Sequence, residues 1–121
     1  MENNILIVED NALIAEDMAD IVQDYLGVTP LVASSCSQAL SKINRNTVLG
    51  LLDIDVTDGP TYDIARHLRE LGIPLVFISG NNPDKLPADL KDLPHLSKPA
   101  LSADVVKLAK TLSANLHVCC V

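Results

Sequence analysis

Short apolar runs alternate with amphipathic stretches along the whole chain. The apolar runs predict strands at 4–8, 29–33, 48–52 and 74–78, with a brief fifth strand at 95–97. The first and third runs are continuously apolar, as in strands that are buried on both faces. Strands that alternate with helices predict a parallel sheet covered by helices on both faces, which is the doubly wound α/β class.

The first two helices have clear signals. Apolar residues at helical spacing predict a helix over 11–26, and Gly27 follows as its stop. Ser35 and Gln38 have the spacing of a capping box, which predicts a second helix that runs to about Asn44.

A third helix is expected over 61–71. Turn residues precede it, and Pro60 suits its first turn. Gly72 is expected to end it. The residues expected to face the core are Ile64, Leu68 and Leu71.

The last part of the chain is less regular. Two prolines within 81–93 limit that stretch to a short helix or a turn around 87–92, so the fourth helix is expected to be short or irregular. Ser102 can cap a final helix. Its apolar stripe is expected to consist of Val105, Leu108, Leu112 and Leu116.

Composition fits one globular domain over residues 1–121. Hydrophobic residues make up 48% of the chain, and the net charge of −7 disfavours binding to nucleic acid or to an anionic membrane. No apolar run reaches the ~20 residues that span a bilayer, and the N-terminus lacks a secretion signal. Three cysteines, two of them adjacent near the end, do not suggest a disulfide framework, so the cytoplasm is the expected location.

Polar residues that can carry chemistry follow four of the five predicted strands. They are Glu9 and Asp10, then Asp53 with Asp55 close behind, then Ser79, and finally Lys98. Because the carboxyl ends of parallel strands share one edge of a sheet, we expect these residues to converge. Clustered carboxylates suit Mg²⁺, and a carboxylate beside the metal can act as a nucleophile toward a phosphoryl donor. The metal, Lys98 and Ser79 would each hold one phosphoryl oxygen.

Together these motifs resemble the receiver domains of bacterial two-component response regulators. The resemblance covers essentially the whole chain. The matching segments are ILIVEDN at 5–11, LLDI at 51–54, VFISG at 76–80 and SKP at 97–99. It implies a flavodoxin-like sheet with strand order 2-1-3-4-5 and a single stand-alone receiver domain without an output domain.

The resemblance also implies roles for the acidic residues. Asp53 corresponds to the phosphoacceptor and also faces the metal. Asp10 would bind Mg²⁺ directly, and Glu9 would act mostly through a water molecule. Asp55 would contribute only its backbone carbonyl.

The resemblance also implies catalytic roles for Ser79 and Lys98 and a conformational switch formed by Ser79 and His95. Ser79 would move toward the phosphoryl group, with Lys98 as the ion-pair partner of that group. His95 stands where many receivers carry Tyr or Phe, and it is either a smaller switch ring or a surface histidine without a role. Ala100 stands where a bulky aromatic residue is frequent, which puts the usual dimer of the family in question.

The implied function is phosphorelay signal transduction by a phosphoprotein. The donor would be a phosphohistidine on a sensor histidine kinase or a histidine phosphotransfer protein. The output would be a contact with an unidentified protein target or onward phosphotransfer, and the chain would catalyse only its own phosphorylation and dephosphorylation. The expected docking surface is the start of the first helix near Asn11, with Ala12, Leu13 and Ala15, although some of these residues could instead complete the core.

Two alternatives stay open. Asp53 and Asp55 also form an Asp-x-Asp-x-Thr pattern, which is similar to the nucleophile motif of haloacid-dehalogenase-like Mg²⁺ phosphatases, with Asp55 as general acid and base. Against this, those enzymes carry their metal-binding acids after the lysine, whereas here only Asp104 follows Lys98. A second alternative is a receiver that binds its partners without phosphorylation.

Overall fold

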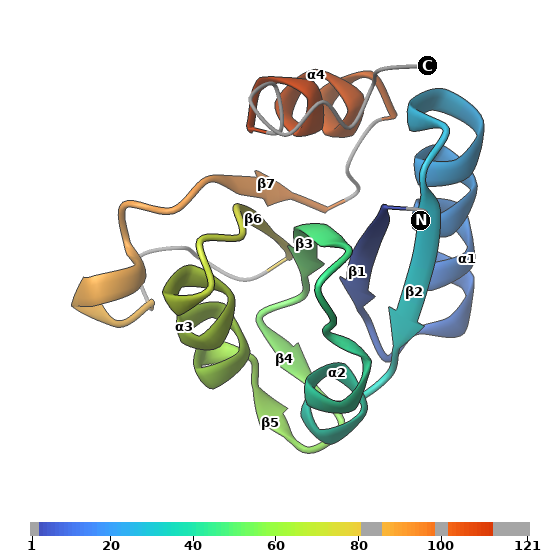
Figure 1. Ribbon diagram of the computed structural model, residues 1–121. Helices are drawn as coiled ribbons and strands as arrows, with labels where there is room; N and C mark the ends of the chain where they lie inside the picture. Colours follow the sequence, from blue (N-terminus) through green and yellow to red (C-terminus); the bar gives the residue numbers. More distant parts are fainter. Residues whose placement is uncertain (1–2, 81–85, 99–101, 113–121) are drawn as a thin grey trace.

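Five parallel strands form the central sheet of the computed structural model, which describes residues 3–80, 86–98 and 102–112. Their spatial order is β2-β1-β3-β6-β7 (Figure 1). The strands are Asn4–Val8 (β1), Thr29–Ala33 (β2), Thr47–Leu52 (β3), Leu75–Ser79 (β6) and His95–Ser97 (β7). In chain order this is the 2-1-3-4-5 arrangement, so the predicted fold class is confirmed.

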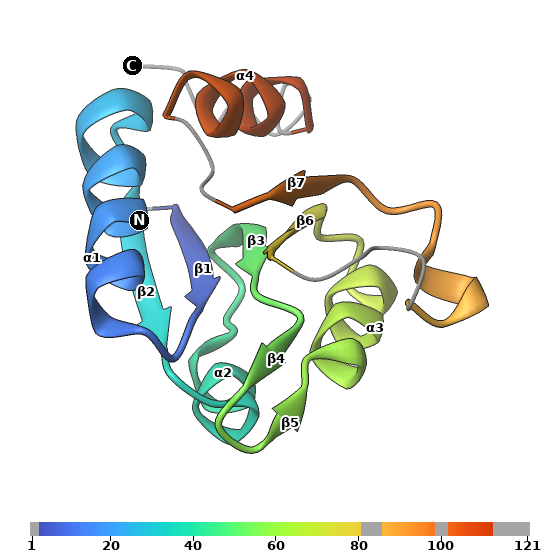
Figure 2. The ribbon, with the colours of Figure 1, turned by 180° about the vertical axis from the view of Figure 1, so that it is seen from behind.

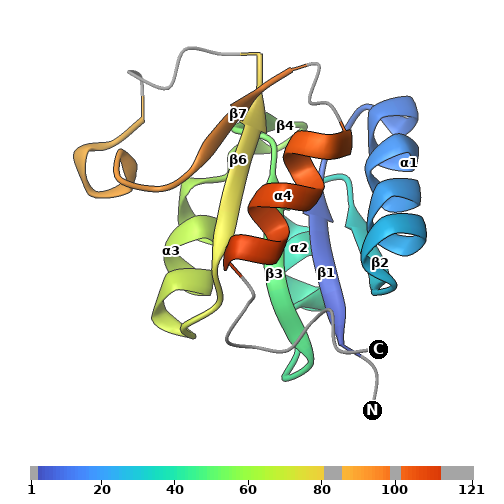
Figure 3. The ribbon, with the colours of Figure 1, turned by 90° about the horizontal axis from the view of Figure 1, so that it is seen from above.

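Helices cover both faces of this sheet. The α-helices are Ala12–Ile21 (α1), Cys36–Lys42 (α2), Tyr62–Glu70 (α3) and Ser102–Leu112 (α4). A π-helical segment, Val22–Leu26, continues α1, and a 3₁₀ turn, Ala88–Leu90, lies between β6 and β7. Figure 3 shows α1 and α4 on one side of the sheet and α2 and α3 on the other. None of the described helices is long and apolar enough to cross a bilayer.

The alternation of β1 side chains explains these two layers. Ile5 and Ile7 pack into the cluster that includes residues of α1 and α4, whereas Leu6 and Val8 pack into the cluster under α2 and α3. All four side chains are fully buried. Successive residues of a strand point to opposite faces, so a continuously apolar strand requires a cover on both sides.

The predicted ends of the first two helices are mostly confirmed. Gly27 adopts a left-handed φ of 65° after the π-helical segment. The Ser35 hydroxyl accepts a hydrogen bond from the Gln38 backbone N–H, as a capping box requires. In a full capping box the Gln38 side chain would also accept a hydrogen bond from Ser35 N–H, but it accepts instead from the N–H of Ser34, one residue earlier. The helix α2 ends at Lys42, before the expected end at about Asn44.

Two expectations about the third helix are wrong. Pro60 does not lie in its first turn, because Pro60 pairs with Asp55 in a two-residue antiparallel ladder between Asp55–Val56 (β4) and Gly59–Pro60 (β5). Leu71 does not face the core but is 53% exposed. Gly72, with φ of 74°, reverses the chain there, and Ile73 packs against the core instead.

The β4–β5 hairpin lies beside α2 (Figure 2). Asp58, at the tip of the hairpin, accepts hydrogen bonds from the backbone N–H groups of Cys36 (2.7 Å) and Ser37 (3.2 Å) in the first turn of α2. The turn residues expected before the third helix thus form a hairpin, and Asp58 links this hairpin to a helix that lies far away in the sequence.

The short 3₁₀ turn between β6 and β7 and part of the apolar stripe of the final helix, α4, agree with the sequence prediction. The 3₁₀ turn falls within the stretch expected at 87–92, and its Leu90 is fully buried. In α4, Val105 and Ala109 are buried and Leu108 is half-buried. Leu116 and Ala100 lie outside the described residues, and so does the side chain of Leu112.

Candidate metal centre

Three carboxylates meet at the carboxyl edge of the sheet. Oxygen atoms of Glu9, Asp10 and Asp53 lie within 4.8 Å of one another. Glu9 and Asp10 follow β1 and Asp53 follows β3, and the last residues of these neighbouring strands, Val8 and Leu52, are paired in register. The convergence expected from the strand ends is therefore present.

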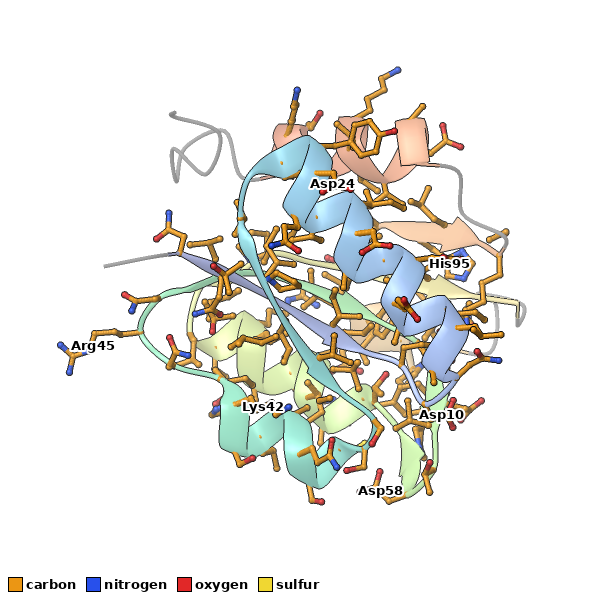
Figure 4. The ribbon with its side chains drawn as sticks, turned by 90° about the vertical axis from the view of Figure 1, so that its right-hand side faces the viewer. Asp10, Asp24, Lys42, Arg45, Asp58 and His95 are labelled. Carbon is orange, nitrogen blue, oxygen red and sulfur yellow. The ribbon has the colours of Figure 1, made fainter. Side chains whose placement is uncertain are left out.

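Two carboxylates of the cluster are buried and the third is exposed to solvent. Glu9 is 2% exposed and Asp53 is 9% exposed, whereas Asp10 lies on the surface. Figure 4 shows Asp10 at one end of the molecule and Arg45 at the opposite end, which is where the strands begin. A ligand can therefore reach the carboxylates from the solvent side of Asp10.

Lys98 joins the two buried carboxylates. Its Nζ atom donates hydrogen bonds to Glu9 Oε1 at 2.5 Å and to Asp53 Oδ2 at 3.0 Å. Its backbone N–H donates to the carbonyl of Ser79 at 3.1 Å, which continues the pairing of β6 and β7 past the last strand residue. The pairing of β6 and β7 thus positions Lys98 beside the acidic cluster.

Burial and charge shift the protonation equilibria of this group. Burial raises the pKa of Glu9, the charge of Asp53 adds to the rise, and the hydrogen bonds from Lys98 and from Asn11 N–H offset only part of it. Burial alone would lower the pKa of Lys98, but its hydrogen bonds to both carboxylates and their negative charges raise it. Lys98 therefore stays positively charged at neutral pH.

The donor set fits a hard divalent cation. Three carboxylates and one ammonium leave two negative charges in the cluster when all are ionised, and oxygen ligands are those that Mg²⁺ prefers. Among the described residues, no second group of three acidic, histidine or cysteine side chains comes as close together. The alternative phosphatase interpretation therefore gains no separate metal site after Lys98 in the described part of the chain.

Backbone hydrogen bonds hold Asp53 in place from two sides. Its N–H donates to the carbonyl of Val8 in β1 at 2.8 Å. Its own carbonyl accepts from the hydroxyl of Thr61 at 2.5 Å. The sequence did not indicate Thr61 as a site residue, because a threonine before a helix is normally explained as a helix cap.

The remaining predicted residues lie at or near the same edge. Ser79 is the last residue of β6 and is 1% exposed. Asp55 opens β4, and its side chain is exposed. His95 pairs with Phe77, two positions before the Ser79–Ser97 pair, and its buried Nε2 has no hydrogen-bond partner among the described residues. The roles of these three residues stay predictions.

The beginning of α1 offers an exposed apolar side chain beside the cluster. Leu13 is 75% exposed and Ala12 also lies on the surface, whereas Ala15 is buried and belongs to the core. The Asn11 side chain caps the helix by accepting from the N–H groups of Leu13 and Ile14.

No family model matches the chain, and no curated protein matches it. Many solved structures do match over nearly its full length. SdrG from Sphingomonas melonis Fr1 is 30% identical, with a TM-score of 0.78 over 92% of this chain and 96% of that chain. The PhyR response regulator REC domain from Erythrobacter litoralis is 27% identical, with a TM-score of 0.75 over 92% of this chain and 89% of that chain.

A more distant match has the same fold. A two-component response regulator from Clostridium difficile is 20% identical, with a TM-score of 0.82 over 95% of this chain and 98% of that chain. At that identity the likeness shows the fold alone.

Proposed function

The chain belongs to the CheY-like receiver domains of response regulators, and on that premise we propose that it is a phosphoacceptor in two-component phosphorelay signalling. The observation that carries the proposal is the meeting of Glu9, Asp10 and Asp53 with the ammonium of Lys98 at one edge of the sheet.

Asp53 is the proposed nucleophile. It is the carboxylate that both belongs to the acidic cluster and contacts Lys98 without being completely enclosed, whereas Glu9 is deeper and Asp10 does not share the lysine. A carboxylate oxygen of Asp53 attacks the phosphorus of a phosphohistidine. A P–O bond forms, the P–N bond breaks, and its electron pair leaves with the imidazole nitrogen, which then takes up a proton.

Four groups of this chain are proposed to hold Mg²⁺. They are the carboxylates of Asp10, Asp53 and, mostly through a water molecule, Glu9, together with the backbone carbonyl of Asp55. Bound Mg²⁺ would reduce the negative charge at the cluster and stabilise an oxygen of the transferred phosphoryl group.

Lys98 and Ser79 complete the proposed site. The ammonium of Lys98 already lies against Asp53, so it can pair with a phosphoryl oxygen once that carboxylate is phosphorylated. Ser79 is proposed to contribute its hydroxyl to another phosphoryl oxygen, and its backbone link to Lys98 N–H keeps both groups on one edge. His95 is proposed as the ring that responds when Ser79 moves.

The proposed donor is a sensor histidine kinase or a histidine phosphotransfer protein. Leu13 and Ala12, exposed at the start of α1 beside the acidic cluster, suit an amphipathic partner helix. The proposal includes a cytoplasmic location, an unidentified protein as the downstream target and no contact with nucleic acid or membrane. Catalysis is limited to the phosphorylation and dephosphorylation of Asp53.

Phosphorylation by a small-molecule donor tests the proposal directly. The purified chain is incubated with Mg²⁺ and acetyl phosphate, and intact-mass measurement is expected to show one added phosphoryl group. Asp53→Asn should not react, whereas Asp55→Asn, which neutralises an exposed carboxylate nearby, should. No uptake by the wild type, or equal uptake by Asp53→Asn, contradicts the proposal.

Turnover separates a receiver from a phosphatase. With an aryl phosphate and Mg²⁺, we expect no sustained release of phosphate. Sustained release that collapses in Asp55→Ala would establish the phosphatase interpretation instead.

A further inference from the structure

Thr61 does not use its hydroxyl in the way its position suggests. It directly precedes α3, where a threonine normally accepts a hydrogen bond from the first turn of the helix. The Thr61 side chain makes no such bond. Instead its hydroxyl donates back to the carbonyl of Asp53 at 2.5 Å, with a second and longer contact to the carbonyl of Ile54 at 3.2 Å.

The backbone of Thr61 also binds a carbonyl group of the segment that follows β3. Its N–H donates to the carbonyl of Ile54 at 2.7 Å, so one residue holds two consecutive carbonyl groups. Thr61 is 0% exposed, so water cannot replace these bonds. A buried carbonyl that loses its partner costs free energy, and the chain would therefore rearrange if the hydroxyl were absent.

The position of these carbonyls matters because β3 ends at Leu52, one residue before Asp53. Beyond that point, within the described part of the chain, the backbone bond that joins Asp53 to the sheet is its N–H donation to Val8. Thr61 supplies the bond on the carbonyl side. The two bonds together determine the direction in which the Asp53 side chain leaves the backbone, because the side-chain orientation follows from the backbone dihedrals.

We infer that Thr61 is a positioning residue for the acidic site, which it serves by fixing the Asp53 carbonyl. The inference rests on the proposed function, since it assigns to Thr61 the alignment of Asp53 for phosphoryl transfer. Small displacements of a reacting group have large effects on rate. The first turn of α3 correspondingly lacks the side-chain cap that Thr61 could have provided.

Two substitutions at Thr61 separate the hydroxyl from the shape of the side chain. Thr61→Val keeps the branched shape and removes the hydroxyl, whereas Thr61→Ser keeps the hydroxyl. With acetyl phosphate and saturating Mg²⁺, we expect the phosphorylation rate of Thr61→Val to fall about tenfold and that of Thr61→Ser to stay within about twofold of the wild type.

Thr47→Val is the matched control. Thr47 is also buried, and its hydroxyl donates to Asn4 Oδ1 at 2.7 Å, but it lies at the beginning of β3, at the opposite edge of the sheet. Its loss should lower stability and leave the phosphorylation rate of the folded protein unchanged. All rates are measured at a temperature at which NMR spectra show each variant folded.

The outcomes separate the two proposals. A wild type that takes up no phosphoryl group contradicts the proposed function. A reactive wild type with an equally reactive Thr61→Val, or with a Thr61→Ser as slow as Thr61→Val, overturns the positioning role alone.

If Thr61→Val does not fold, an NMR measurement on the wild type tests the inference. On addition of Mg²⁺ and beryllofluoride the amide signal of Thr61 should shift and that of Thr47 should not. An unmoved Thr61 signal overturns the inference.

Discussion

The ammonium of Lys98 lies 3.0 Å from the carboxylate of Asp53, although 45 positions separate the two residues in the sequence. The same ammonium also contacts Glu9. Among the described residues it is the cationic side chain that offsets these two buried carboxylates. Lys98 therefore has a consequence for stability as well as a proposed role in phosphoryl transfer.

Replacing Lys98 with methionine should destabilise the protein when no Mg²⁺ is present. The side chain keeps its length but leaves two buried carboxylates without a counter-charge, which typically costs about 3–5 kcal/mol. Chemical denaturation measures the loss in the free energy of unfolding. Because a divalent cation can offset the same charges, saturating Mg²⁺ should recover part of the loss.

Lys91→Met provides the control for this substitution, since Lys91 is exposed. It should leave stability nearly unchanged with and without Mg²⁺. A Lys98→Met variant as stable as Lys91→Met in Mg²⁺-free buffer would show that the lysine does not compensate the cluster.

The Lys98→Met variant also addresses the conformational response. Asp53 stays intact, so the variant should still bind beryllofluoride with Mg²⁺. Without the ammonium there is no ion pair to draw β7 toward the modified group, and NMR shift changes along His95–Ser97 should be smaller than in the wild type. Changes of wild-type size would remove Lys98 from the switch.

Mg²⁺ should stabilise the folded chain through the acidic cluster. A ligand at 100 times its dissociation constant adds about 2.7 kcal/mol to the free energy of unfolding. We expect Asp10→Asn and Asp53→Asn to lose most of this gain. Asp55→Asn should keep it, because only the backbone carbonyl of Asp55 is proposed to bind the metal. Denaturation curves with and without Mg²⁺ measure the gain, and a loss in Asp55→Asn equal to that in Asp10→Asn would contradict the assignment.

The raised pKa of Glu9 predicts how stability depends on pH in the absence of metal. The folded protein binds the Glu9 proton more tightly than the unfolded chain, in which the pKa has its ordinary value of 4.5. Stability should therefore fall as the pH rises from about that value through the higher pKa of the folded state. Lys98 does not reverse this trend, because its raised pKa makes its contribution decline only at pH values above 10.5.

Glu9→Gln removes this titration. Its stability relative to the wild type should increase between pH 4 and pH 7, a range set by the ordinary carboxyl values. Glu16→Gln removes an exposed carboxylate on α1 and serves as the control. If both variants followed the wild-type pH profile, the burial of Glu9 would have no effect on stability.

The sequence was sufficient for the parallel sheet and for the convergence of the acidic residues, because both follow from local patterns. Continuous apolar runs identify buried strands, and the parallel arrangement then brings together whatever follows Val8, Leu52 and Ser79. Parallel strands alone place Glu9 and Asp53 at the same edge, so no knowledge of distances is needed for this prediction.

The missed features all depend on contacts between distant segments. Pro60 lies in a hairpin that Asp58 ties to α2, 22 positions earlier in the chain. Thr61 bonds back to Asp53 rather than to its own helix. Leu71 is exposed because Ile73 fills the core position after the turn. Periodicity and capping rules describe only neighbours along the chain, so none of these arrangements could be read from them.

Arginines of α3 bind the 3₁₀ turn Ala88–Leu90. The two acidic partners of Arg66 should contribute unequally to holding this turn against α3. Arg66 donates two hydrogen bonds to Asp89, at 2.9 and 3.1 Å, but only one to Asp63, at 3.2 Å. Asp63 belongs to the same helix as Arg66, so of the bonds that Arg66 makes, those to Asp89 connect two elements. Asp89→Asn should therefore loosen the 3₁₀ turn more than Asp63→Asn does.

Amide hydrogen exchange at Leu90 measures this effect. The Leu90 N–H donates to the carbonyl of Pro87 within the turn, and its side chain is completely buried, so its exchange reports opening of the segment. Exchange should accelerate in Asp89→Asn and stay close to the wild-type rate in Asp63→Asn. Because the ion pairs are exposed, high salt should reduce the difference between the variants. Equal exchange in the two variants at low salt would mean that the buried Leu90 and the bonds from Arg69 to the Asp89 carbonyl and to Asp92, and not the Arg66–Asp89 pair, hold the turn against α3.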